Sequence, residues 1–133
     1  MKIINVGNPA APSLVGSYAN NDYAWQVAVS GNYAYLVSYN LGLEILDVSN
    51  RAAPTKVGDY GGKRYTSIQF RAGKAYIGAP KDALVILDAA NPAAPSLVSN
   101  VPTSAVANGS AIQGNYAYVA DDGYYGSSSL AIY

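Results

Sequence analysis

The stretch Leu43-Glu44-Ile45-Leu46-Asp47-Val48-Ser49-Asn50-Arg51-Ala52-Ala53-Pro54 decides the fold, because the chain contains it three times in related form. An apolar run is followed by an Asn-x-Ala-Ala-Pro segment, and the same order recurs at residues 1–12 and at residues 84–95. A fixed period of this kind is the signature of a repeat protein, in which each repeat is one supersecondary unit. We therefore predict a repeat architecture.

A second motif recurs with the same period. It reads GNYAYLV at residues 31–37, AGKAYIG at residues 72–78 and GNYAYVA at residues 114–120. Counted from the Leu43 position of each copy, successive copies are 42, 41 and 46 residues apart, which is the spacing of propeller blades. We predict a single propeller segment over residues 1–133, with repeats at approximately 1–42, 43–83 and 84–129 and a fourth copy beginning at 130–133.

Within a repeat, apolar and polar residues alternate with a period of two, as at Trp25, Val27 and Val29. This period predicts strands, and the Gly-Asn and Asn-Pro segments between the runs predict turns. We expect an all-β fold of four-stranded antiparallel blades, with three blade-equivalents per chain packed face to face around an axis. The two complete blades have predicted strands at 24–30, 33–37, 43–48 and 55–60, and at 66–71, 74–78, 84–88 and 96–100.

These motifs resemble the LVIVD-repeat β-propeller family. The resemblance is carried by residues 43–47 and 84–88, each followed by its Asn-x-Ala-Ala-Pro segment, and by the Gly-Asn-Tyr-Ala-Tyr hairpin, and it covers essentially the whole chain. It implies a propeller fold and, for a parent protein, an extracellular or cell-surface location. It implies no particular activity, because propellers host many unrelated functions. The first copy departs from the pattern, with Asn5 in the place of the Asp.

The composition argues against most enzyme chemistries. The chain has no Cys and no His, which removes thiol and imidazole catalysis and the usual zinc and copper sites. Eight basic and eight acidic residues balance, so charge gives no reason to expect nucleic acid or an acidic membrane surface as a partner. No apolar run has the length of a signal peptide core or a transmembrane segment. We expect a non-enzymatic protein without cofactor or metal.

Several segments carry groups that occur in active sites, and a structural interpretation is favoured for each. Asp47 and Asp88 end their strands before a turn, where a carboxylate accepts hydrogen bonds from backbone amides two or three residues on. Asp121 and Asp122 precede a Gly, but the alternating ligands and the closing Glu of a calcium loop are missing. The hydroxyls of residues 127–129 have no neighbouring base.

A ligand-binding surface is the alternative function. In a propeller, the loops before the first strand of each blade and between its second and third strands share one face, and here they are rich in Tyr, Asn and Asp. Exposed Tyr and Asn side chains suit a glycan or a peptide. The predicted ligand-binding residues are Tyr23, Tyr39, Arg64, Tyr65, Asp121, Asp122, Tyr124 and Tyr125. Tyrosines inside strands are expected to pack between blades instead, namely Tyr33, Tyr35, Tyr76, Tyr116 and Tyr118.

The two ends of the chain predict self-association. Residues 1–18 supply the outer two strands of a blade, and residues 108–133 supply the inner three. Three blades do not close a ring, and open strand edges template aggregation. We expect a homodimer of six blades that acts as a structural or interaction scaffold, in a chain that is either a natural fragment or an engineered subunit. A trimer would have nine blades.

One strand is present twice. Residues 1–4 and 130–133 are copies of the third strand of a blade, and in a closed ring they compete for one place. Ile3 and Ile4 are β-branched, whereas Ala131 buries little apolar surface. We expect residues 1–4 to take the place and residues 130–133 to be displaced or paired at an edge. The residues assigned to assembly are Met1, Ile3, Ile4, Leu130, Ile132 and Tyr133.

Overall fold

Every regular element in the described residues is a β-strand. The computed structural model describes residues 1–80, 83–102, 106–122 and 129–132. Within them, thirteen strands form four separate antiparallel sheets. The all-β class predicted from the two-residue period is confirmed. Accordingly, these ranges contain no long apolar helix of the kind that crosses a membrane.

Two sheets are complete four-stranded blades whose strands pair in sequence order. The first contains β3 (Ala24–Ser30), β4 (Tyr33–Ser38), β5 (Leu43–Asp47) and β6 (Thr55–Tyr60). The second contains β7 (Ser67–Arg71), β8 (Lys74–Ala79), β9 (Ala83–Asp88) and β10 (Ser96–Val101). These bounds agree with the predicted ranges to within one residue, because the hairpin and Asn-x-Ala-Ala-Pro turns fix where each strand ends.

The other two sheets are incomplete. The first pairs β1 (Lys2–Asn5) with β2 (Ser13–Ser17), and the other contains β11 (Val106–Gln113), β12 (Tyr116–Asp122) and β13 (Ser129–Ile132). In the order of the repeat, β1 and β2 are the third and fourth strands of a blade, and β11 to β13 are the first three. The predicted placing of partial blades at the two ends is therefore confirmed.

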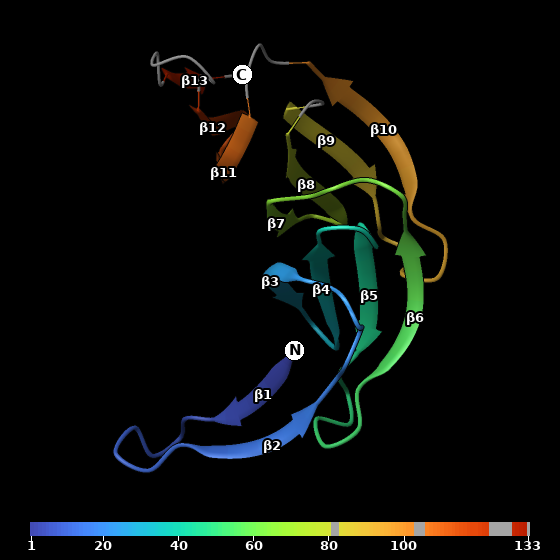
Figure 1. Ribbon diagram of the computed structural model, residues 1–133, viewed down its shortest axis with the longest axis vertical. Helices are drawn as coiled ribbons and strands as arrows, with labels where there is room; N and C mark the ends of the chain where they lie inside the picture. The colour runs from blue at the N-terminus through green and yellow to red at the C-terminus, as the bar shows by residue number, and fades with distance from the viewer. Residues whose placement is uncertain (81–82, 103–105, 123–128, 133) are drawn as a thin grey trace.

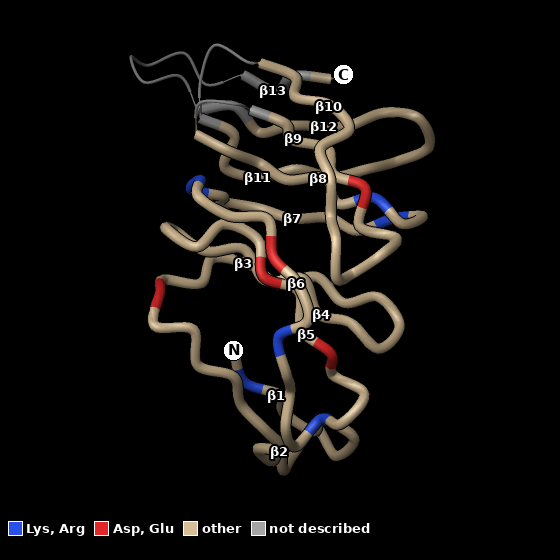
Figure 2. The backbone as a smooth tube through the Cα atoms, turned by 90° about the vertical axis from the view of Figure 1, so that its right-hand side faces the viewer, with Lys and Arg blue, Asp and Glu red and all other residues tan. Residues whose placement is uncertain are grey.

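The sheets follow one another along an open arc (Figure 1). The first strand of each blade, β3, β7 or β11, lies on the inner side of the arc, and the fourth strand, β2, β6 or β10, lies on the outer side. A view turned by 90° shows β1 and β2 at one end, the first complete blade above them, and the second complete blade together with β11–β13 at the other end (Figure 2). Sheets stacked face to face around an axis are the arrangement of propeller blades.

An Asx turn ends the third strand of each repeat. The Asp47 carboxylate accepts the Ser49 N–H at 2.8 Å, and the Asp88 carboxylate accepts the Ala90 N–H at 3.0 Å. Asn5 does the same in the first repeat, where its side-chain oxygen accepts the Gly7 N–H at 2.9 Å. The turn role predicted for the two aspartates is confirmed. Asn5, which departs from the repeat pattern, still supplies a side-chain oxygen as the acceptor.

Apolar side chains fill the spaces between neighbouring sheets. The larger cluster joins the two complete blades, where Val37, Ile45, Ile68 and Ile77 are fully buried. A smaller cluster, which includes Leu84, Ala107, Ala117 and Val119, joins the second blade to β11–β13. The core therefore lies between blades rather than inside any one sheet, so a blade needs a neighbour on each face to be covered.

The tyrosines in the strands follow this rule. Tyr35 is 2% exposed and packs between the two complete blades, as predicted. Tyr116 is 58% exposed, so the prediction that it packs between blades is wrong for the isolated chain. Ala117 and Val119 face the second blade, and alternation along β12 turns Tyr116 and Tyr118 to the opposite, open side. No further sheet covers that side in the described part of the chain.

Glycine allows close approach between one blade and the turn of the next. A Cβ built at Gly16 on β2 would overlap the Arg51 carbonyl oxygen, and one at Gly58 on β6 would overlap the Pro92 carbonyl oxygen. The two contacts are equivalent, since each joins a fourth strand to the next Asn-x-Ala-Ala-Pro turn. Ser99 takes this place on β10, where it pairs with Ile86 as Gly58 pairs with Ile45.

Candidate assembly faces and loop surface

The partial sheet β1–β2 has the register of a complete blade. Ile3 pairs with Gly16 and Ile4 with Leu14, with a bulge between the two pairs. In the first complete blade, Ile45 pairs with Gly58 and the register shifts immediately after it. The turn after β1 and the contact of Gly16 with the next blade are also in place. The half-sheet is therefore built and positioned as a blade that lacks its first two strands.

The strand β13 has the register of a third strand beside β12. Ile132 pairs with Tyr118 and Ala131 with Val119. In the first complete blade the equivalent pairs are Ile45 with Tyr35 and Glu44 with Leu36. The second complete blade has the same register. The described part of the segment expected at an edge, residues 130–132, thus takes the position of a third strand in the isolated chain.

An apolar face of β3 is open where the half-sheet lacks strands. Val27 is 42% exposed and Val29 is 65% exposed, although the residues at their positions in β7 are Ile68, fully buried, and Phe70, packed against the core. A hollow of about 280 Å³ lies beside this face, lined by Met1, Lys2, Ile3, Val27, Val29, Ala34, Val48 and Arg51. Two of the predicted assembly residues, Met1 and Ile3, therefore line a space between the half-sheet and the first complete blade.

The opposite end of the chain also has an opening. A pocket of about 400 Å³ lies between the second blade and β11–β13, and the residues that line it include Tyr76, Leu84, Ile86, Val101, Ile112 and Ala117. The other predicted assembly residues are divided between the two ends, with Ile4 in β1 and Leu130, Ile132 and Tyr133 at the C-terminal end. Ile4 and Ile132 are 52% and 59% exposed, Leu130 pairs through its backbone with Ala120, and Tyr133 lies outside the described residues.

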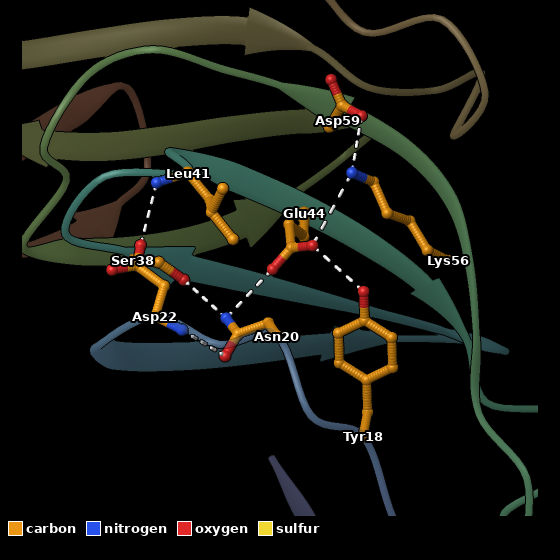
Figure 3. A network of polar contacts seen from close by, with 8 residues as sticks. All are labelled: Tyr18, Asn20, Asp22, Ser38, Leu41, Glu44, Lys56 and Asp59. Atoms are coloured by element: carbon orange, nitrogen blue, oxygen red, sulfur yellow. Dashed lines mark hydrogen bonds and ion pairs between the residues drawn. The ribbon is translucent and has the colours of Figure 1, made fainter.

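A buried carboxylate joins the half-sheet to the first complete blade (Figure 3). Glu44 is 3% exposed and accepts hydrogen bonds from the Tyr18 hydroxyl at 3.1 Å and from the Asn20 amide at 3.0 Å. The Lys56 ammonium lies 3.7 Å from the same carboxylate and 2.8 Å from the carboxylate of Asp59. The two partners from the first repeat and the cation of β6 together compensate the buried charge.

These contacts shift the ionisation of the groups around Glu44. Burial raises the pKa of the Tyr18 phenol, and its hydrogen bond to Glu44 raises it further. The hydrogen bond to Asp59 raises the pKa of Lys56, against the opposing effect of burial. Sequence reasoning missed this network. The available signal was that Glu44 occupies the position of Val85 in the next repeat, so that a charge stands at a core position of an apolar strand.

A second carboxylate closes the loop between β4 and β5. Asp22 accepts the N–H groups of Asn40 at 2.7 Å and of Leu41 at 2.9 Å, as well as the Asn40 side-chain amide at 3.0 Å. Desolvation acts to raise the pKa of Asp22, but the combined hydrogen bonds outweigh it and the pKa lies below its usual value. Asp22 therefore has a structural role at the predicted loop face.

The structure brings part of the predicted ligand-binding set together. The Arg64 guanidinium lies over the Tyr39 ring, 4.7 Å from its centroid, and over the Trp25 ring, 5.6 Å from its centroid. Tyr23 is next to this cluster through the backbone bond from the Tyr39 N–H to its carbonyl, and it is 78% exposed. Sequence reasoning assigned Trp25 to a strand and missed its contact with Arg64.

The remaining predicted ligand-binding residues are not part of the cluster. Tyr65 is fully buried, so its placement on the exposed face is wrong. Its position before β7 corresponds to that of Ala107 in the next repeat, which is also fully buried and could have indicated a core residue. Asp121 and Asp122 belong to β12 by their backbone, and Tyr124 and Tyr125 lie outside the described residues.

Charged groups are sparse and spread over the described residues (Figure 2). Within the part of the chain that the structure describes, no three acidic side chains are grouped in a way that would hold a metal ion. The arrangement supports packing between blades, pairing of strands, and contact of the Arg64 guanidinium with the Tyr39 and Trp25 rings.

The repeat motifs match a family model described as the LVIVD repeat, over residues 1–20, 22–61, 71–103 and 106–125. The chain belongs to the LVIVD-repeat family. The match to the LVIVD repeat confirms the resemblance drawn from the strand and hairpin motifs. A search of curated proteins found no match.

Solved structures similar to this LVIVD-repeat chain include two designed proteins. The computationally designed Ika8 protein has a TM-score of 0.68 and 9% identity, over 88% of this chain and 36% of that one. The computationally designed Ika4 protein has a TM-score of 0.65 and 8% identity, over 83% of this chain and 64% of that one. The chain thus spans less than two thirds of either protein, and at these identities the likeness shows the fold alone.

Proposed function

We propose that this LVIVD-repeat chain is a non-enzymatic scaffold module whose copies associate into a closed β-propeller ring, with two chains and six blades. The observation that carries the proposal is the complementarity of the partial sheets. β1 and β2 are the third and fourth strands of a blade, and β11 and β12 are the first two. A second copy supplies what each partial sheet lacks, and cyclic closure leaves only the short inner and outer edges that every propeller blade has.

The open faces support this proposal residue by residue. Phe70 on β7 stacks with Tyr35 of the preceding blade, and Ile112 on β11 packs near Tyr76. Val29 occupies the same position on β3, so in the ring it would meet Tyr118 of a partner chain. Both sides of this contact are on the open faces described above, and their burial supplies a hydrophobic driving force.

Light scattering coupled to size-exclusion chromatography tests the proposal. At micromolar concentration we expect one species of twice the chain mass of 13.8 kDa. A mass of three chains would mean nine blades, and a series of growing masses would mean open polymers; both contradict the six-bladed ring. A monodisperse monomer over the whole concentration range would overturn self-association altogether.

The absence of catalysis is part of the same proposal. Asp47 and Asp88 each hold a backbone turn, and the chain has no Cys and no His. A stoichiometric transition metal in the purified protein, or a turnover lost on replacing Asp121, would contradict it. A calcium-dependent rise in melting temperature would instead indicate a calcium site at the Asp121-Asp122 segment. An extracellular location stays a prediction from the family resemblance.

A second candidate function is ligand binding at the loop cluster of Tyr39, Trp25 and Arg64. A guanidinium held over aromatic rings keeps its outer N–H groups available for an acidic or hydroxyl-rich ligand, and exposed rings stack on sugars or peptides. A glycan and peptide array, repeated with Arg64→Ala, tests this function. Arg71→Ala is the matched control, because Arg71 bonds the Gly114 carbonyl at a different hairpin. Equal signals from both variants would contradict the site.

A further inference from the structure

We propose that β13 holds, within one chain, the place that β1 of a second copy takes when the ring closes, so that closure proceeds by strand exchange at the edge of β12. This inference rests on the proposed self-association and adds to it the acceptor edge, the incoming segment and the segment that leaves. Both segments are third strands of the same repeat, and the edge of β12 has room for one of them.

The hydrogen-bond alternation shows which groups the acceptor edge offers. In the first complete blade, the Ser38 N–H donates to the Gly42 carbonyl and the Val48 N–H donates to the Asn32 carbonyl. Bonded pairs recur at every second residue of an antiparallel ladder, so the pair of Leu36 and Glu44 between them is also a bonded pair. The equivalent pair beside β12 is Val119 with Ala131.

The same alternation shows that β1 is prepared to pair on its outer edge. Met1 and Tyr18 exchange both main-chain bonds, at 2.6 Å and 2.9 Å. The N–H of the next residue, Lys2, is therefore directed away from β2, toward the missing second strand. Lys2 is the counterpart of Glu44 and Ala131 in the repeat. In the ring, its N–H would meet Val119 of the partner, the group that Ala131 meets in the free chain.

The side chains favour β1 over β13. The fourth position of the third strand is fully buried in both complete blades, where Leu46 and Leu87 occupy it. Ile4 supplies a side chain of matching volume at this position, whereas the other copy supplies Tyr133, which is larger and carries a hydroxyl. Lys2 is long enough to keep its ammonium in water while its stem follows the sheet.

The connections also favour β1. Closure with β1 keeps its existing pairing with β2, including both bonds between Met1 and Tyr18, and costs the pairing of β13 with β12, which β1 replaces. Closure with β13 retained would require β1 to leave β2 so that β2 could pair with β13. The number of strand pairs is the same in both rings, so the preformed β1–β2 unit and the fit of Ile4 decide the outcome.

Two proline variants distinguish whether β1 or β13 pairs with β12 in the dimer. Ala131→Pro removes the N–H that β13 offers to Val119, and Lys2→Pro removes the N–H that β1 offers to the partner while its bonds to β2 remain. We expect Ala131→Pro to lower the dimer dissociation constant by about tenfold, equivalent to about 1.4 kcal/mol. Lys2→Pro should raise it by about the same factor. Light scattering over a dilution series measures both, and circular dichroism checks that each variant folds.

The outcomes distinguish this inference from the proposed function. Weaker assembly for Ala131→Pro, together with no change for Lys2→Pro, would contradict the exchange and show that β13 keeps the place. Wild-type affinity in both variants would overturn strand exchange and leave the dimer standing. Monomers for all three proteins at every concentration would overturn both. If Lys2→Pro fails to fold, a labelled peptide of residues 1–6 provides the second measurement, since it should bind Ala131→Pro more tightly than the wild-type chain. If Ala131→Pro fails to fold, a chain that ends at Ser129 replaces it in both measurements.

Discussion

The Tyr35 ring on β4 stacks against the Phe70 ring on β7, with centroids 4.1 Å apart and planes inclined by 19°. This contact joins two complete blades, and stacked rings contribute beyond the apolar area that they bury. Its counterpart between the second blade and β11–β13 involves Tyr76 and Ile112. The third counterpart needs Tyr118 and Val29, which lie on the two open faces of the chain. The contact therefore indicates where a charge would interfere with assembly.

Replacing Val29 with Lys should prevent ring closure without unfolding the chain. Val29 is 65% exposed in the free chain, so its loss should change the free energy of unfolding of the monomer by about 0.5 kcal/mol or less. In the ring the ammonium would be buried against Tyr118, and light scattering should report monomers at micromolar concentration. Leu14→Lys is the matched control, because Lys56 stands at that position in the first complete blade and remains 41% exposed. Equal loss of assembly in the two variants would contradict the interface.

Replacing Gly58 with Ala should destabilise the pair of complete blades. The new Cβ would overlap the Pro92 carbonyl oxygen, which is backbone and cannot move aside cheaply. We expect a loss of about 1–3 kcal/mol in the free energy of unfolding, measured by urea denaturation. Gly61→Ala is the control, since the nearest atom to its Cβ, the Leu41 carbonyl oxygen, is at an ordinary distance of 3.5 Å. A Gly58→Ala protein as stable as the control would show that this close approach does not matter.

The hydrogen bond from Tyr18 to Glu44 should make the fold sensitive to alkaline pH. The pKa of Tyr18 is raised by burial and by Glu44, so the folded state keeps its proton where the unfolded state loses it. Its contribution is full below the ordinary tyrosine pKa of 10.0 and is lost as the pH rises through the folded pKa. Tyr18→Phe should cost about 1 kcal/mol at pH 7 and flatten this alkaline loss.

Tyr35→Phe provides the comparison for the alkaline measurement. Burial raises the pKa of Tyr35 as well, and the neighbouring Tyr33 adds to the effect, but Tyr35 is in the larger core cluster and Glu44 has no part in its shift. Chemical denaturation between about pH 8 and about pH 11, a range that includes the ordinary tyrosine pKa, measures the wild-type protein and both variants. An unchanged alkaline slope in Tyr18→Phe would contradict the role of the bond to Glu44.

Replacing Asp47 with Asn should preserve the fold, and replacing it with Ala should lower the melting temperature. Hydrogen bonds from the Ser49 hydroxyl and amide lower the pKa of Asp47, so the stability that it contributes is present above the ordinary value of 3.8 and is lost as the pH falls through the folded pKa. Asn keeps the acceptor, as Asn5 does in the first repeat. Melting curves between neutral and acid pH should show a weaker acid dependence for Asp47→Asn. Equal melting temperatures for the Asn and Ala variants would show that the turn at Asp47 does not contribute to stability.

The sheets could be predicted from the sequence because their signals are local and repeated. The alternation in residues 43–48, the turn acceptor Asp47 and the Gly31 hairpin, where φ is 56°, each act over a few residues, and three copies reinforce one another. The strand bounds and the partial blades at both ends follow from these signals. The same period gave the right face for Tyr35, since burial between blades is common to every complete interface.

The site was less predictable because it depends on contacts between repeats. Arg64 meets Trp25 and Tyr39 only after the two complete blades pack, and no spacing in the sequence brings these three together. Tyr65 was placed on a loop by composition, although the start of β7 turns it into the core. Glu44 looks like a solvated residue until Tyr18 and Asn20 of the preceding repeat cover it.

Ser99 would make one contact between blades of the proposed ring weaker than its counterparts. Where Gly16 and Gly58 let a fourth strand touch the following turn, Ser99 carries a Cβ, so in the proposed ring the contact between β10 and the Pro9 turn of a second copy would have to be wider. The three contacts between neighbouring blades in each half of the proposed ring would then be unequal in strength, and the contact between chains would open first. Dilution or mild heating would divide such a ring into two intact arcs before any blade melts, and each arc could be returned to the ring or exchanged for another.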